Sequence, residues 1–547
     1  MNHPTPSDGR VAVVRGTAAY PADAPYHPDT RFPELAALGA AVGPADSNPA
    51  YRMVREALVH LGGGIGAPGD PAWNPLAAWI RPGDRVLLKP NWVMDWHPNE
   101  AMLGEQLALD SLVTHPAVLR AVLDYAQLAL GGRGQLTIAD APLQACDLPR
   151  LQQRTHIAAL TEHFAALARA GMPVVPVTTE DLRLEIAAAS SLPGGIGQVY
   201  RKVRRDDEGR HLFVQVGEAS QLEPIAADWQ RFRVTCYDPS AMGEAHRPGH
   251  HMYCIGRAVL EADCVIDLPK FKTHKKSGIT VALKNLIGIN GHKSYLPHHR
   301  RGSIASGGDE FLAADPLKEA GAALQDRQHT DGQAPWLQRA AALGASGLAA
   351  VNRALRQDGT ESGSWYGNDT IWRTCIDLNR VLLYADAQGQ FPRAADAQPC
   401  RRVLHIVDGI IGGDCDGPLN PRPQLAGVVL AGGHAAFVDI AAALVMGLDW
   451  RAIPIVAGAF APGEGPALCR LPPEALELVG NVSSWCGAGA AVLDGLPGAL
   501  DFQPATGWEG AVDRGAYRTP RLPADASVRP MGALWRSDDL DRLIGPR

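Results

Sequence analysis

Short apolar runs that end in a polar or charged residue recur along the chain and predict the strands of a buried sheet. We expect strands at residues 11–14, 85–88, 135–140, 172–177, 264–268, 401–408 and 424–430. Stretches with helical spacing separate them, at residues 51–61, 151–170, 256–262, 365–384 and 434–447. A further helix follows Thr114, its predicted N-cap, because Val118, Val122 and Tyr125 recur at helical intervals. This alternation predicts an α/β fold with a mostly parallel sheet core and flanking helices.

Two segments interrupt the alternation. Residues 197–233 contain short alternating runs that predict a small antiparallel excursion, and residues 316–358, rich in Ala, Leu, Gln and Arg, predict an inserted helical layer. We therefore divide the chain into a first part of the core (1–310), a helical insertion (311–365), a second part of the core (366–485) and a peripheral C-terminal tail (486–547).

The helix predicted at 365–384 carries a charged row beside its apolar stripe. Asn368 or Asp369 can cap it, and the row consists of Arg373, Asp377 and Arg380. A structural ladder of ion pairs is the slightly favoured interpretation of this row. Because the helix follows an aromatic-rich loop, a substrate-binding role for Arg373 stays open.

Lysine is concentrated in one stretch of the chain. Nine lysines occur in all, and six of them fall within residues 265–299, while arginine supplies most positive charge elsewhere. A lysine can act as a nucleophile or as a titrating base, whereas an arginine guanidinium stays charged. The pattern favours a functional site over the alternative of a solvated basic loop.

The composition, the net charge and the cysteine spacing restrict the classes of function that we expect. The hydrophobic content of 46% and charged content of 20% are typical of a soluble globular protein, and the net charge of −7 argues against a nucleic-acid partner. We expect no signal peptide and no membrane span, hence a cytoplasmic protein. The nine cysteines form no C-x-x-C pair, so no iron–sulfur cluster motif is present. A basic site in an acidic protein predicts a small anionic partner.

Polar residues follow several predicted strands. Lys89 and Asn91, Asp140, the group at residues 270–274 and Asp408 each come after an apolar run. Ligands of parallel sheets bind beyond the carboxyl ends of the strands, so these segments predict one site. Lysines there can bind phosphate or carboxylate, and His274 can carry a proton. Asp140, Asp408 and Asp414 could hold a divalent metal, whose identity the sequence leaves unknown, or could orient the bases.

Each single residue also has a structural interpretation. His274 could be a hydrogen-bonded core histidine, and Lys284 could merely reach out of an apolar layer. Asp439 lies in a nearly apolar helix, where a capping or ion-pair role is favoured over catalysis.

The same segments carry a resemblance. L-K-P-N-W at 88–92, T-H-P-A-V from Thr114, L-P-K-F-K-T-H with A-L-K-N-L-I-G between 268 and 288, and D-G-I…D-G-P followed by A-A-F-V-D-I-A-A-A-L-V-M-G resemble the family catalogued as domain of unknown function 362. The resemblance spans about residues 80–450 and implies a soluble α/β fold but no particular reaction. The positions that match the family are Lys89, Asn91, His115, Lys270, Lys272, His274, Lys284, Asn285, Asp408 and Asp439. Many relatives carry ferredoxin-type cysteine motifs, which this chain lacks.

A fainter likeness is to the lactate racemase family, in which a histidine, a lysine and a second histidine hold a nickel-pincer nucleotide. His274, Lys284 and His292 occur here in that order, although the flanking residues do not match.

The sequence thus predicts an enzyme that acts on a small phosphate- or carboxylate-bearing metabolite. The expected catalytic residues are Lys270, Lys272, His274, Lys284 and Asp408. The expected substrate-binding residues are Lys89, Asn91, His115, Asp140, Asn285, His292 and Arg373. Two alternatives use the same residues: a protein that binds or carries a cofactor or other small molecule, including a redox or nickel-pincer site, and an interaction protein whose lysines meet an acidic partner.

Overall fold

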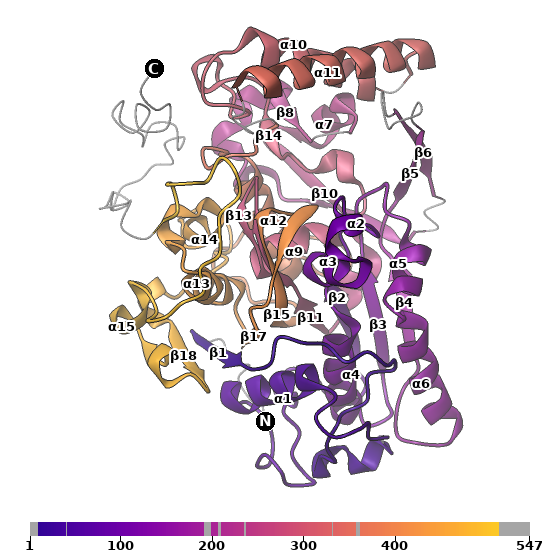
Figure 1. Ribbon diagram of the computed structural model, residues 1–547. Coiled ribbons are helices and arrows are strands. Elements are labelled where there is room, and N and C mark those ends of the chain that lie inside the picture. The colour runs from indigo at the N-terminus through magenta and orange to yellow at the C-terminus, as the bar shows by residue number, and fades with distance from the viewer. Residues whose placement is uncertain are drawn as a thin grey trace.

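The computed structural model describes residues 9–39, 41–190, 199–205, 209–234, 237–330, 332–356 and 362–513. A large mixed sheet crosses the molecule (Figure 1). Its strand order is β19 (Gly487–Ala488), β18 (Glu477–Gly480), β1 (Arg10–Arg15), β17 (Val428–Gly432), β15 (Arg402–Asp416), β11 (Cys264–Leu268), β2 (Arg85–Pro90), β3 (Gln135–Asp140) and β4 (Val177–Asp181). The five strands from β15 to β4 are parallel to one another.

Strand β15 is long and has two neighbours in succession on one side. Its first part pairs with β11, and its later part pairs with β12 (Lys270–His274), which resumes the same path after Pro269. Strands β13 (Gly278–Thr280) and β16 (Asn420–Gln424) complete this extension of the sheet. The first two lysines of the lysine-rich stretch, Lys270 and Lys272, therefore lie on a strand that follows the carboxyl end of β11.

Helices cover both faces of the sheet, as alternate residues of the strands require. Helices α1 (Pro49–Leu61) and α4 (Pro116–Leu130) pack on the face that presents Ala12, Val14 and Ile406. Helices α12 (Ile371–Tyr384) and α13 (Ala435–Met446) belong to the core on the other face, with Val13 and Val407. The predicted α/β fold is confirmed.

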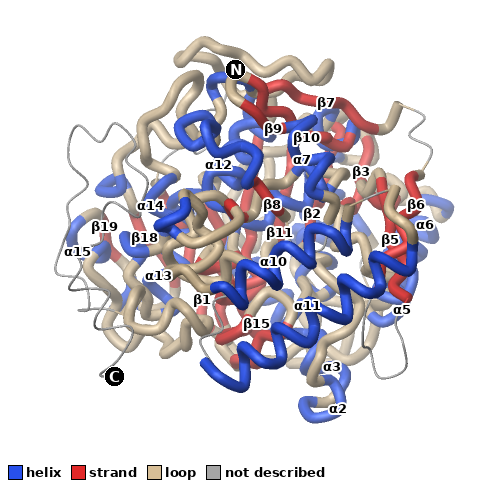
Figure 2. The backbone as a smooth tube through the Cα atoms, turned by 90° about the horizontal axis from the view of Figure 1, so that it is seen from above, coloured by secondary structure: helices blue, strands red, loops and turns tan. Residues whose placement is uncertain are grey.

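The smaller elements also match the expected fold class. Strands β7 (His211–Gln215), β10 (His250–Gly256) and β9 (His246–Arg247) form a small antiparallel sheet, and β5 (Glu185–Ser190) pairs with β6 (Val199–Arg204). Helices α10 (Pro316–His329) and α11 (Pro335–Arg356) lie side by side as an added helical layer (Figures 1 and 2). Residues 331, 357–361 and 514–547 of the predicted insertion and tail lie outside the described residues.

Several predicted boundaries are wrong. The stretch 151–170 forms two helices, α5 (Leu148–Arg154) and α6 (Ile157–Arg169), and the strand after them begins at Val177. Strand β15 does not end at Asp408 but continues through the glycines to Asp416. The N-cap of α4 is His115, whose ring accepts from Ala117 N at 3.1 Å, whereas Thr114 donates to Leu268 O at 2.6 Å. In the described part of the chain, no helix has both the length and the apolar character needed to span a bilayer.

Candidate functional site

Three aligned residues begin the site on neighbouring parallel strands. Lys89 of β2 lies beside Asp267 of β11, and Asp267 lies beside His405 of β15. Side chains in register on adjacent strands point to the same face, so the three form one row. His405 Nδ1 is 2.9 Å from Asp267 Oδ2. Lys89 pairs with Asp140 at the end of β3, and its Nζ lies 2.8 Å from Asp140 Oδ1.

A chain of hydrogen bonds extends this row. Asn285 Nδ2 donates to Asp267 Oδ1 at 2.7 Å, and Asn91 Nδ2 donates to Asn285 Oδ1 at 2.8 Å. Lys272 Nζ then donates to Asn91 Oδ1 at 3.1 Å. The expected residues Asn91, Lys272 and Asn285 are thus joined to the strand ends by direct contacts.

Positive side chains gather where these segments meet. We call Lys89, Lys272, Lys284 and Lys293, together with His274 and His298, the lysine cluster. The four lysines are no more than 9% exposed, so the alternative of a solvated basic loop is wrong. Lys284 is their common neighbour, because its charge contributes to the lowered pKa of Lys272, Lys293, His274 and His298.

Each lysine of the cluster is held differently. Lys89 has Asp140, while Lys272 Nζ donates to the last carbonyl of helix α3 (Glu105–Leu112), Leu112 O, at 2.6 Å. Lys293 Nζ donates to Asn290 O at 3.2 Å and to Ile287 O at 3.3 Å. Among the described residues, Lys284 Nζ has no hydrogen-bond or ion-pair partner.

Burial dominates the ionisation of the cluster. It lowers the pKa of Lys293 to about 7, against the attraction of Asp140, and it lowers the pKa of Lys284. Lys272 lies well below the ordinary lysine pKa because burial is reinforced by Lys270 and Lys284. Burial therefore favours the neutral form of the Lys272, Lys284 and Lys293 amines, which exposes their lone pairs.

Backbone hydrogen bonds orient the two histidines. Nδ1 of His274 accepts from Lys276 N at 3.0 Å and from Ser277 N at 3.3 Å, so in the neutral ring Nε2 carries the proton. His298 is the opposite tautomer, because its Nδ1 donates to Leu296 O at 2.6 Å and Nε2 keeps the lone pair. Burial is the largest cause of a low pKa in both rings, which holds them neutral.

Hydrogen bonds with two side chains on other helices hold the helix turn that bears Lys284. Helix α9 (Ala282–Asn285) is capped by Asp439, whose carboxylate accepts from Ala282 N at 2.8 Å and from Leu283 N at 3.3 Å. Asn379 Nδ2 donates to Leu283 O at 2.8 Å. The capping interpretation of Asp439 is confirmed, and the backbone of Lys284 is held independently of its amine.

Lys270 belongs to a neighbouring subsite. Its Nζ donates to Asp408 Oδ2 at 3.0 Å and to the Tyr20 hydroxyl at 2.9 Å, while Tyr20 donates to Asp408 Oδ1 at 2.5 Å. His115 N donates to Asp408 Oδ2 at 2.8 Å, and its ring stacks on Tyr20 at 3.9 Å. Asp110 lies 3.8 Å from His115 Nε2, and burial raises the pKa of Asp110 to about 6.

The three carboxylates proposed for a divalent metal are held apart, each by its own cation. Asp140 pairs with Lys89, Asp408 with Lys270, and Asp414 with Arg422 at 2.8 Å. The described part of the chain contains no group of three or more His, Cys, Asp or Glu side chains placed to hold a metal ion.

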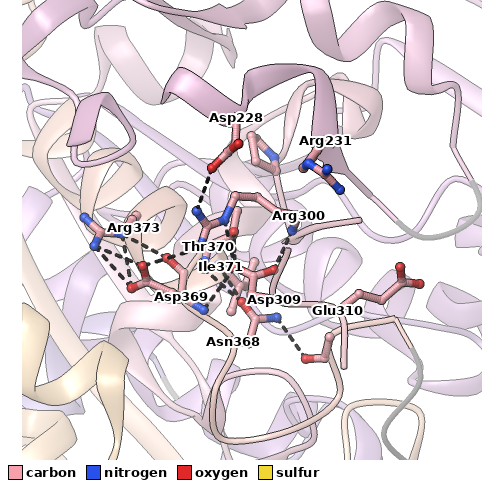
Figure 3. A network of polar contacts seen from close by, with 12 residues as sticks. Asp228, Arg231, Arg300, Asp309, Glu310, Asn368, Asp369, Thr370, Ile371 and Arg373 are labelled. Atoms are coloured by element: carbon pink, nitrogen blue, oxygen red, sulfur yellow. Dashed lines mark hydrogen bonds and ion pairs between the residues drawn. The ribbon is translucent and has the colours of Figure 1, made fainter. Parts of the chain in front are cut away.

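Arg373 lies in another network, drawn in Figure 3. Its guanidinium contacts Asp369, with NH2 to Oδ1 at 3.2 Å, and Arg300 reaches the same carboxylate at 3.8 Å. Asn368 Nδ2 donates to His298 O at 2.8 Å, and Asn368 Oδ1 accepts from the first residue of α12, Ile371, at 3.1 Å. The network therefore ties the loop carrying His298 to α12.

Five members of the site were not singled out from the sequence. Tyr20, Asp267, Lys293 and His405 contribute the contacts described above, and His298 adds a second histidine. Asp267 could have been identified from the sequence, because it is a charged residue within the apolar strand V-I-D-L at 265–268. His292, which was expected to bind substrate, stacks its ring on Tyr295 at 4.3 Å.

Gly288 is packed against the Lys89–Asp140 pair and gives a test of it. A Cβ at this position would lie 2.0 Å from Asp140 Oδ1 and 2.6 Å from Lys89 Nζ. We predict that Gly288→Ala lowers the free energy of unfolding by about 3 kcal/mol, because it separates a buried ion pair. Gly321→Ala in α10, where nothing lies within 4 Å of the added Cβ, should be neutral or stabilising. Equal stability of the two variants in denaturant titrations would contradict this role.

The comparisons with known proteins bear on the region that holds most of the site. The family described as "Domain of unknown function (DUF362)" matches residues 206–444, a range that includes Lys270, Lys272, His274, Lys284 and Asp408. Lys89, Asn91, His115 and Asp140 precede the matched range, which is narrower than the resemblance read from the motifs. No curated protein and no solved structure matches the chain. The chain therefore resembles the DUF362 family, as its motifs indicate, over residues 206–444.

Proposed function

We propose that this protein is an enzyme that acts on a small anionic metabolite, bearing a phosphate or carboxylate, at the lysine cluster. The observation that carries the proposal is the excess of buried positive groups over carboxylates. Of the four cluster lysines, only Lys89 has a carboxylate partner among the described residues. Burying a cation without an opposite charge costs several kcal/mol, so an anionic ligand would stabilise the site by completing it.

The contacts suggest separate tasks for the lysines. Lys293 Nζ donates to two carbonyl oxygens, so its ammonium form keeps a third donor for a phosphate or carboxylate. Lys272 Nζ already has three oxygen partners, and Lys89 is held by Asp140. Lys284 is the candidate base or nucleophile, since burial lowers its pKa and no protein group occupies its amine in the described part of the chain.

The histidines supply complementary proton positions. His274 presents an N–H at Nε2, so it can donate a hydrogen bond to substrate. His298 presents a lone pair at Nε2, so it can accept a proton. In the subsite of Lys270, Asp408 is saturated by Lys270, Tyr20 and the His115 backbone, which supports an orienting role. We further propose a reducing, cytoplasmic setting, which suits the eight described cysteines, all of them free.

The first test compares three lysine variants. We predict that Lys284→Met weakens sulfate binding, measured by calorimetry, by about tenfold or more, because it removes an uncommitted donor. Its melting temperature should not fall, because the variant also removes a buried, unpaired amine. Lys89→Met should instead destabilise the fold by about 3–5 kcal/mol, since Asp140 loses its partner.

Lys318→Met in α10, outside the cluster, serves as the control and should leave the sulfate affinity unchanged. Unchanged sulfate affinity in Lys284→Met would remove Lys284 from the site.

The second test is pH dependence. In the free protein the pKa of Lys293 is about 7, so above this pH the amine must take up a proton before it can pair with an anion. Sulfate stays doubly charged through the neutral range and is a suitable probe. We predict that its affinity falls as the pH rises above 7, by up to about tenfold per pH unit for each proton taken up.

In Lys293→Met the slope should be shallower, because one of the titrating amines is gone. An affinity that stays constant or rises between neutral and alkaline pH would be incompatible with binding by the cluster.

A further inference from the structure

We propose that Lys284 forms an imine with the carbonyl group of an anionic ketone or aldehyde, so that the substrate class of the site is an anionic carbonyl compound. This inference rests on the proposed function, since the cluster must first bind the anionic group. It adds a covalent step and assigns one nucleophilic atom, Lys284 Nζ.

The first supporting observation is that the Lys284 amine makes no hydrogen bond or ion pair that stabilises the described part of the fold. The side chain is 9% exposed, yet no hydrogen bond or ion pair engages Nζ among the described residues. Lys89, Lys272 and Lys293, its neighbours, are each fixed by a carboxylate or by carbonyl oxygens. Only an amine that keeps its lone pair available can attack a carbonyl carbon.

The second observation is an orphaned hydroxyl in the same segment. Thr280 Oγ1 is buried and has no hydrogen-bond partner. Thr280 lies directly opposite Lys272 in the β12–β13 pair, so both side chains are on the same face of the ladder. A buried polar atom left unpaired costs about 1–3 kcal/mol, and a substrate oxygen at this position would satisfy it.

The third observation is that the reacting amine would be well positioned. Asp439 caps the turn of α9 and Asn379 binds the carbonyl of the preceding residue, Leu283. The amine therefore moves only by rotation of its own side chain, while its backbone stays fixed. Burial, reinforced by the charge of Lys89, lowers the pKa of Lys284 and favours the neutral amine before substrate arrives.

The chemistry balances with the groups present. Neutral Lys284 Nζ attacks the carbonyl carbon, and His274 donates a hydrogen bond from Nε2 to the developing alkoxide. His298 Nε2 takes one proton from the nitrogen and returns it to this oxygen, which gives the neutral carbinolamine. The same ring then carries the second nitrogen proton to the hydroxyl, which leaves as water, so the imine forms with no oxidant or reductant consumed.

Borohydride trapping tests this inference directly. The full-length protein is incubated briefly with glyoxylate, a small oxo acid, and with cyanoborohydride, and the lysines are mapped by peptide mass spectrometry. We expect carboxymethylation of Lys284 to be about tenfold faster or more than that of Lys318, because the neutral amine is more populated and the carboxylate is bound nearby. Sulfate should protect Lys284 and leave Lys318 unaffected.

The outcomes separate the two proposals. Labelling of Lys284 no faster than that of Lys318, with sulfate still bound by the protein, would overturn the imine and leave the anion site standing. Failure of both labelling and sulfate binding would overturn both. Because the wild-type chain is mapped, the test does not depend on the folding of a variant.

Discussion

The burial of lysine amines at the carboxyl edge of a parallel sheet is the constraint around which this structure is arranged. An ammonium removed from water needs an opposite charge or several oxygens, and otherwise it tends to lose its proton. Strand register brings Lys89, Asp267 and His405 into one row, and the segment after β11 adds Lys270, Lys272 and Lys284. Neighbouring elements must therefore supply the oxygens that hold these amines.

The oxygens come from three sources, and their distribution separates the lysines that protein oxygens hold from one that they do not. Asp408 and Asp140 neutralise Lys270 and Lys89, and the end of helix α3 binds Lys272. Lys284 receives nothing equivalent from the described residues, although Asp439 holds its backbone. The two halves of the site thus differ in their internal pairing: Lys270 is paired with Asp408, whereas among the described residues only Lys89 of the four cluster lysines has a carboxylate partner.

Much of the fold follows from the sequence because strands and helices depend on local patterns. The alternation of apolar runs and helical spacing predicted the α/β core, the antiparallel excursion and the helical layer, and the lysine window indicated where the site lies. The predicted ends of strands and helices were wrong where tertiary contacts determine them. The strand predicted to end at Asp408 continues through Gly412 and Gly413. A Cβ on Gly412 would lie 2.8 Å from Phe271 O, and one on Gly413 would lie 2.6 Å from Pro421 Cβ.

The sequence predicts which residue types form the candidate site, but it does not predict which of these residues contact one another. Partners such as Asp267 and His405, or Tyr20 and Lys270, are far apart in sequence and meet only through strand register and the path of the N-terminal segment. Arg373 was predictable as part of a charged row, yet only the structure links it to Asp369 (Figure 3). Whether a buried amine is paired or free depends on contacts that no local pattern encodes.

The most direct measurement is a crystal structure of the protein soaked in selenate, with the selenium located by its anomalous signal. The account predicts a selenate ion within hydrogen-bond distance of Lys284 Nζ, with contacts to Lys272 or Lys293. Selenate found only at the surface, with the lysine cluster unchanged, would contradict the claim that these buried amines form an anion-binding site.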